Sequence, residues 1–170
     1  MPKIGHTMPE PDCSTGAAPI HLETFLPYRL NQLSTEISHT LARSYSERFG
    51  ISIPEWRVLA TLGQFGMITA REISLHSRMH KTTISRAVAA LEARKLLMRK
   101  PNKQDMREAF LTLTEEGRVM YFEIVPMARH FADSLCQGLT PTELETFGLL
   151  ISKLIDRVGK IASTSGMITE

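Results

Sequence analysis

Five polar side chains fall close together near the middle of the chain, and their chemistry suits a nucleic acid. Lysine and hydroxyl groups can bond phosphate oxygens, a threonine methyl group can contact thymine, and an arginine can fork onto guanine O6 and N7. Apolar residues recur between them at helical spacing, so one helix would expose them at its N-terminal end. The residues are Lys81, Thr82, Thr83, Ser85 and Arg86.

A second basic group follows, in and between two short segments at 97–100 and 109–113 that look like β-strands. The runs and the polar stretch between them predict a β-hairpin with a long basic loop, which could lie along the sugar-phosphate backbone or in a minor groove. We expect Arg107 to be the inserting side chain and Asp105 to support either its guanidinium group or the turn. The basic residues are Lys100, Lys103 and Arg107.

Charge is segregated along the sequence. Residues 54–113 hold eleven lysines and arginines against five acids, a net charge of +6, whereas the remainder holds nine against thirteen, a net charge of −4. The asymmetry indicates a module that faces a polyanion, although an ordinary solvated basic face would give the same count.

Several start signals predict the helices that must position these groups. Ser52 with Glu55, and Thr69 with Glu72, have the spacing of capping boxes. The first pair would open a helix that Gly63 and Gly66 end, and the second a short helix with Ile73 and Leu75 turned inward. After a break around residues 78–79, a fourth helix is expected over 81–95.

Long apolar stripes flank this central segment. The first runs from Leu22 to Tyr45, the second is expected at Phe122, Val125, Phe131 and Leu135, and the third follows a capping box at Thr140 and Glu143. A module of about 60 residues could not cover all of them. A helical dimer interface would cover them, and an intramolecular three-helix bundle is the alternative.

The order helix, helix, short helix, turn, helix, hairpin is the plan of a winged helix-turn-helix. We therefore expect a mainly α fold with a small β-hairpin wing and a helical dimerisation region. The expected regions are a disordered N-terminal tail (1–19), a dimerisation helix (20–50), a winged helix-turn-helix DNA-binding module (51–113), C-terminal dimerisation helices (114–162) and a frayed tail (163–170).

The segments PEWRVLATL, TTISRAVAALEARKLLMRK, DMR and LTLTEEG resemble the MarR family of bacterial regulators. The resemblance implies a two-fold dimer built from the first and last two helices, with two winged modules on a pseudo-palindromic operator. It also implies repression that is released by a small phenolic or aromatic-acid ligand. Two positions depart from the family pattern: His80 stands where an acid is common, and Lys95 where glycine is favoured.

The resemblance further implies an effector pocket between the dimer helices and the winged module. The FLPYRLN segment resembles a subgroup that responds to aromatic acids such as hydroxycinnamates. An aromatic carboxylate needs an apolar slot with one or two fixed donors. The candidates are Tyr28, Asn31, His39, Trp56 and Arg57. Bonds among these residues, or to solvent, are the alternative interpretation.

Other classes of function leave weaker signals. Thiol-based redox sensing would use Cys13 or Cys136, but no cation neighbours Cys13 to lower its pKa. A winged-helix protein-interaction module without DNA binding is a second alternative. No sequence motif of an enzyme is present, and His76 with His80 lack a third metal ligand, so we expect no catalysis, metal or cofactor. Without a secretory signal or a membrane-spanning run, the cytoplasm is the expected location.

Overall fold

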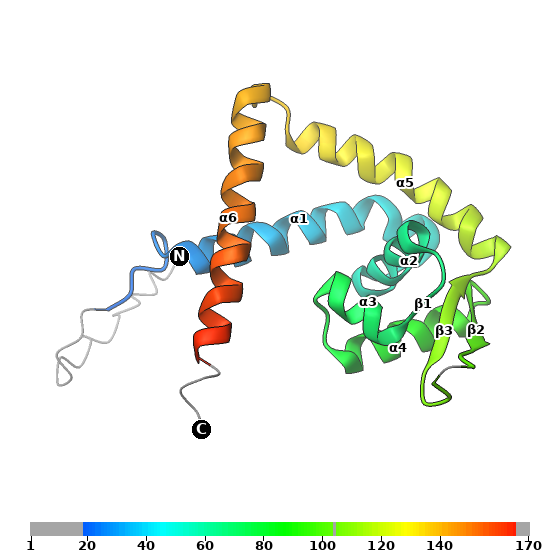
Figure 1. Cartoon of the computed structure of the whole chain (residues 1–170). Coiled ribbons are helices and arrows are strands. Elements are labelled where there is room, and N and C mark those ends of the chain that lie inside the picture. The colour runs from blue at the N-terminus through cyan, green and yellow to red at the C-terminus, as the bar shows by residue number, and fades with distance from the viewer. Residues whose placement is uncertain (1–18, 104, 166–170) are drawn as a thin grey trace, which may run out of the picture. The chain divides into compact units, whose positions relative to one another are not determined.

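The computed structural model describes residues 19–103 and 105–165. They divide into two compact units, one up to Thr40 and one from Leu41 onward. Helix α1 (Leu26–Phe49) crosses this division. The second unit continues with α2 (Ile53–Phe65), β1 (Ile68–Thr69), α3 (Ala70–Ser77), α4 (Lys81–Ala93), β2 (Leu97–Pro101), β3 (Ala109–Leu113), α5 (Glu115–Leu135) and α6 (Pro141–Ser165) (Figure 1). Helix α6 thus continues into the segment predicted as a frayed tail.

Both central capping boxes are confirmed. The Ser52 backbone N–H donates to the Glu55 carboxylate at 2.7 Å, and the Thr69 backbone N–H donates to Glu72 at 2.7 Å. Hydrogen bonds from the Thr69 backbone and side chain lower the pKa of Glu72. These local contacts satisfy donors that would otherwise be unpaired at the starts of α2 and α3.

The predicted hairpin is confirmed, and it belongs to a sheet with one more strand than expected. The order is β1-β3-β2 and both pairings are antiparallel, with Leu97 opposite Leu113 and Pro101 opposite Ala109. Sequence periodicity did not reveal β1, because two residues are too few to show the alternation of a strand. Thr69 ends this strand and also caps α3.

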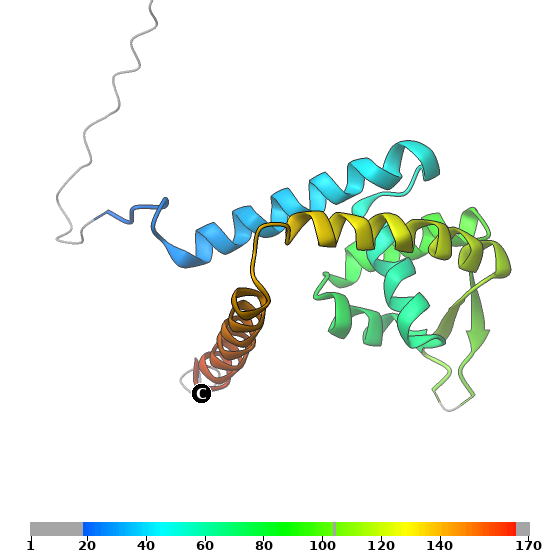
Figure 2. The same cartoon turned by 90° about the horizontal axis from the view of Figure 1, so that it is seen from above.

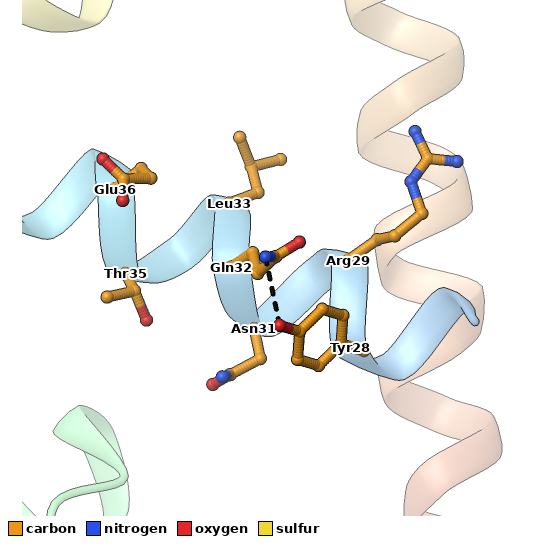
Figure 3. Close-up of a pocket in the computed structure, with 7 residues that line it drawn as sticks. All are labelled: Tyr28, Arg29, Asn31, Gln32, Leu33, Thr35 and Glu36. Carbon is orange, nitrogen blue, oxygen red and sulfur yellow. Dashed lines mark hydrogen bonds between the residues drawn. The ribbon is translucent and has the colours of Figure 1, made fainter. Parts of the chain in front are cut away.

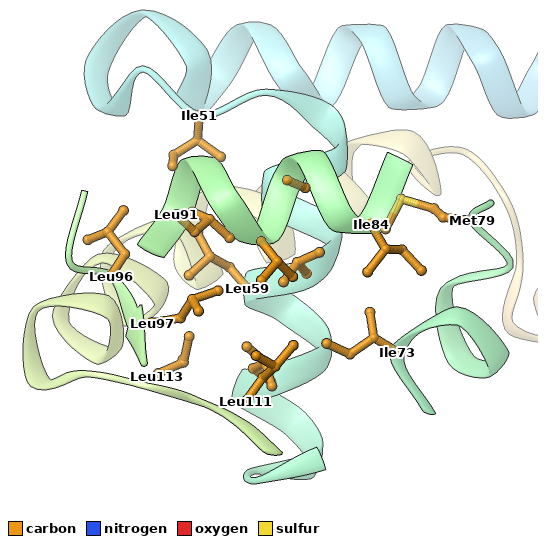
Figure 4. Packing of buried hydrophobic residues seen from close by; sticks show 14 of the residues in the cluster. Ile51, Leu59, Ile73, Met79, Ile84, Leu91, Leu96, Leu97, Leu111 and Leu113 are labelled. Carbon is orange, nitrogen blue, oxygen red and sulfur yellow. The ribbon is translucent and has the colours of Figure 1, made fainter. Parts of the chain in front are cut away.

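One hydrophobic core lies between the helices and the sheet of the second unit (Figure 4). Ile84 and Leu91 of the recognition-helix candidate α4 point into it and are 1% and 0% exposed. They meet Leu59 from α2 and Leu111 from β3, which are equally inaccessible. This shared core holds α4 and the hairpin on a common base.

Of the two glycines predicted to end α2, Gly66 does so and Gly63 does not. The helix continues to Phe65, and Gly66 follows it with a φ of 75°, which favours glycine. A Cβ atom on Gly63 would lie 2.5 Å from the Tyr121 ring. Gly63 therefore allows α5 to approach α2, a tertiary requirement that a sequence window does not contain.

One residue predicted to face inward, Leu75, is instead exposed. Leu75 is 61% exposed, and Ile73 alone anchors α3 among the buried residues of that helix. On α5, Phe122 is 66% exposed and Leu135 is also exposed, whereas Ile124 is buried. The apolar stripe expected on α5 is therefore partly open in the single chain, and α5 contributes Ile124, which is not part of that stripe, to the core of the winged module.

Beyond the winged module, α6 keeps its large apolar residues at the surface, and none of its described side chains is buried. In both views α5 leads away from the sheet and α6 begins after a turn (Figures 1 and 2). Within the described ranges, no helix combines the length and hydropathy that crossing a bilayer requires.

Candidate nucleic-acid interface

Helix α4 separates a buried face from a polar one, as its sequence predicts. Ile84, Ala87, Val88 and Leu91 are buried on one side. Of the five predicted contact residues, Thr83 is half-buried and the others are exposed: Lys81, Thr82, Ser85 and Arg86. The helix is therefore held by its apolar face while its N-terminal polar residues are open to a ligand.

His80 begins α4 and acts as its N-terminal cap. Its Nδ1 atom lies 2.9 Å from the Thr82 hydroxyl and accepts the Thr82 backbone N–H at 3.4 Å. This contact gives α4 the side-chain acceptor that an N-terminal cap supplies. The cap is thus made without placing a carboxylate beside the polar end of α4.

The other end of α4 is fastened to α1 by Arg94, a residue that the sequence analysis did not single out. Its guanidinium group donates to the Phe49 carbonyl at 2.7 Å and to the Gly50 carbonyl at 2.8 Å. Both carbonyls lie at the C-terminal, negative end of α1, where a cation is favoured. No sequence signal marks this pair, because the partners are more than forty residues apart.

Lys95 follows with a φ of 59°, in the left-handed region that favours glycine. Its carbonyl accepts the Thr114 hydroxyl at 2.7 Å, which ties the helix end to the start of α5. Lys95 stands where the resembled family favours glycine, and the backbone at this position has the conformation that glycine adopts most easily. A lysine occupies a backbone conformation that strains a residue with a Cβ atom.

In the hairpin, the basic residues are exposed and the turn is held by local bonds. The Asp105 carboxylate accepts the Arg107 backbone N–H at 2.9 Å, so the contact made by Asp105 is with the turn and not with the guanidinium. Asn102 in turn accepts the Asp105 backbone N–H at 3.2 Å. Lys100, Lys103 and Arg107 are all exposed on this hairpin.

Three aromatic rings connect α1, α2 and α5 within the second unit. Trp56 lies between Tyr45, with ring centroids 5.6 Å apart, and Tyr121, with centroids 6.2 Å apart. Burial raises the pKa of Tyr45 to about 12, with a smaller opposing influence of Arg57. Trp56, predicted as an effector contact, thus has a packing role in this structure.

The predicted effector residues are divided between the two units. Trp56 and Arg57 belong to the second unit, and the others to the first. In the first unit, Tyr28 and Asn31 line a surface hollow of about 530 Å³ whose described lining comes entirely from α1 (Figure 3). The Tyr28 hydroxyl accepts a hydrogen bond from the Gln32 side chain at 3.3 Å. His39 is exposed further along α1.

The residues of the weaker hypotheses are placed as follows. Cys13 lies outside the described residues, and Cys136 is a half-buried free thiol at the end of α5. The His76 ring stacks on Phe65 with centroids 3.9 Å apart. Within residues 19–103 and 105–165, no group of three potential metal ligands gathers.

An anchored helix with an exposed polar end, next to a basic β-hairpin, defines the winged helix-turn-helix class of DNA-binding proteins. The family model described as MarR family matches residues 51–109. Residues 51–109 therefore carry a domain of the MarR family of transcription regulators.

Comparisons with individual proteins agree with this assignment. The HTH-type transcriptional regulator Hpr of Shouchella clausii is 27% identical over 62% of this chain. That match spans only 54%, about half, of the relative's own length. A MarR-family regulator from Silicibacter pomeroyi has a solved structure that is 27% identical, with a TM-score of 0.70 over 81% of this chain and 92% of that one.

A further solved structure is described as the mechanism by which 6-hydroxynicotinic acid regulates DNA binding by BpsR of Bordetella bronchiseptica. It is 24% identical, with a TM-score of 0.72 over 82% of this chain and 99% of that one. At this level of identity the likeness shows the shared fold.

Proposed function

We propose that this protein is a dimeric transcription repressor that holds a pseudo-palindromic operator in duplex DNA. The observation that carries the proposal is the exposed polar end of α4 beside the basic hairpin, with both fixed to one core. In this arrangement α4 enters the major groove and the hairpin reaches the adjacent minor groove.

Arg86 has the leading role in reading sequence. It is exposed on α4, one turn after Thr82, and an arginine that forks onto guanine contributes about 1–3 kcal/mol of discrimination. Arg107, at the exposed turn of the hairpin, contacts the backbone or a minor groove, and Lys100 and Lys103 add charge beside it. Phosphate contacts of this kind set affinity more than they set sequence preference.

The dimer is supported by the apolar surface that this chain leaves uncovered. Ile155 and Val158 of α6 are 61% and 65% exposed, and Phe122 of α5 is similarly open. Soluble monomers rarely leave so many large apolar residues in contact with water. A second copy would cover them by a self-complementary contact, and two-fold symmetry then matches the symmetry of a pseudo-palindromic site.

An aromatic acid or phenol is the proposed effector, by extension from the 6-hydroxynicotinic acid of BpsR. Tyr28, Asn31, His39 and Arg57 are the proposed polar contacts, with Trp56 as an aromatic neighbour. Such a ligand would act by preferring the conformation that does not bind DNA, since equal affinity for both conformations shifts nothing.

Selection of bound genomic fragments tests the DNA-binding proposal. Arg86→Ala should weaken binding to the selected fragments by about 5- to 150-fold, and binding to random duplex much less, because a base contact is lost. Arg107→Ala should weaken both alike. Arg118→Ala, an exposed arginine on α5, serves as the matched control. Equal loss on both DNAs for Arg86→Ala would remove it from base reading.

A panel of aromatic acids added to the complex tests the effector proposal. Release by an acid, without release by the matching aromatic alcohol, would support recognition of a carboxylate. Release by oxidants alone would instead favour the thiol-sensing alternative. If the protein binds no duplex at all, the interaction-module alternative replaces the proposed function.

A further inference from the structure

A hollow of about 400 Å³ lies where α3, α4 and the hairpin meet. Its floor is apolar and includes the buried Ile84 and Val88 of α4. Its rim carries four basic side chains and one acid, contributed by all three elements. They are Arg71 from α3, Lys81 from α4, Arg99 from β2, and Arg107 and Glu108 from the hairpin.

Three of these cations have no charged partner within the described part of the chain. Arg99 is held by Glu92, with its Nε atom 3.0 Å and 3.1 Å from the two carboxylate oxygens. Within residues 19–103 and 105–165, the side chains of Arg71, Lys81 and Arg107 make no ion pair and no hydrogen bond. The bond from Arg107 to Asp105 uses the backbone N–H. The rim therefore has an excess of positive charge, which favours the binding of an anion.

The location of the hollow between α4 and the hairpin indicates which anion it would bind. If α4 lies in a major groove and the hairpin reaches the neighbouring minor groove, the strand between those grooves passes over the hollow between them. We infer that this hollow seats a phosphodiester of that strand, with Arg71 as a phosphate contact beside Lys81 and Arg107. The inference rests on the proposed function and adds α3 to the DNA-binding surface.

The sequence alone did not indicate Arg71, because it stands just inside the α3 capping box and apart from both basic groups. The structure brings it to the same opening as Lys81 and Arg107. An arginine fork suits a phosphate because two parallel N–H groups can bond two of its oxygens. Glu108 on the same rim would repel that phosphate.

Binding of a random duplex at several salt concentrations tests the inference. Arg71→Gln should lower affinity about tenfold, the worth of one charge-assisted contact, and reduce the slope of log affinity against log salt by about 0.9 for each bound protomer. Arg71→Lys should keep most of the slope. Arg118→Gln, remote from the hollow, should change neither quantity.

Glu108→Gln gives a prediction of opposite sign, which damage to the fold would not produce. Removing its charge should tighten binding by about two- to fivefold, the worth of one screened charge pair. An unchanged slope in Arg71→Gln, or weaker binding in Glu108→Gln, would overturn the phosphate seat while wild-type binding still supports the proposed function. Failure of the wild-type protein to bind duplex would overturn both.

Discussion

The winged module and helix α6 belong to the same chain but differ in how far their apolar residues are buried. Leu91 of α4 is 0% exposed, within a core that five helices and the sheet share, whereas Leu150 of α6 is 52% exposed. The module is therefore specified by contacts within one chain. The apolar side of α6 carries comparable residues that no described residue of its own unit buries, and the proposed dimer would cover them.

The same Leu→Ala change in the core of the module and on α6 should have different effects on stability. Leu91→Ala should lower the free energy of unfolding of the module by about 2–5 kcal/mol, because it leaves a cavity in a packed core. Leu150→Ala should leave the unfolding of the module unchanged and weaken self-association. Chemical denaturation at several protein concentrations measures both effects.

If Leu150→Ala destabilised the module as much as Leu91→Ala and did so at every protein concentration, α6 would be part of the core of the single chain. The dimer explanation of its apolar residues would then be wrong.

The close approach of α5 to α2 gives the next largest effect. Gly63→Ala should destabilise the protein by about 1–3 kcal/mol, because the added methyl group must displace the Tyr121 ring. In an open helix the same change would stabilise by about 0.5–1 kcal/mol. Thermal melting gives the sign directly, and Gly63→Ala with Tyr121→Leu should recover part of the loss.

A smaller effect is expected where Arg94 joins α4 to the end of α1. Arg94→Ala should cost about 1 kcal/mol of unfolding free energy, because two charge-assisted hydrogen bonds to helix-end carbonyls are lost. Arg48→Ala is the matched control, since Arg48 makes an exposed ion pair with Glu123 at 3.5 Å and a cation–π contact with the Phe49 ring at 4.9 Å. Equal losses for the two variants would show that the Arg94 bonds add nothing beyond a surface charge.

The smallest effect has the opposite sign. Lys95→Gly should raise the free energy of unfolding by up to about 1 kcal/mol, since relief of left-handed strain exceeds the added freedom of the unfolded chain. Lys95→Ala keeps the Cβ atom and should not stabilise. Differential scanning calorimetry distinguishes the two variants, and a lower Tm for the glycine variant would contradict the strain interpretation.

Local signals predicted the parts of this structure that depend on neighbours in sequence. The capping boxes at Ser52 and Thr69 opened helices as expected, and the buried face of α4 followed its apolar period. The wrong predictions depended on tertiary contacts. Gly63 allows the Tyr121 ring to approach α2, and Ile124, which lies outside the predicted α5 stripe, is the residue that α5 buries in the core.

The candidate site shows the same division. The polar end of α4 and the basic hairpin could be predicted, because each lies within one continuous stretch of sequence. Arg71 and Arg94 could not, because their neighbours come from elements distant in sequence. The effector residues and the dimer remain predictions, since both need contacts that the single chain does not contain.

The salt dependence of wild-type binding to duplex DNA is the decisive test of the proposed DNA-binding surface. If the polar end of α4 and the basic hairpin grip DNA, log affinity should fall linearly with log salt, with a slope near −0.9 for each phosphate contacted. Binding that is absent, or that stays constant as salt rises, would contradict the claim that residues 69–113 form a surface for DNA.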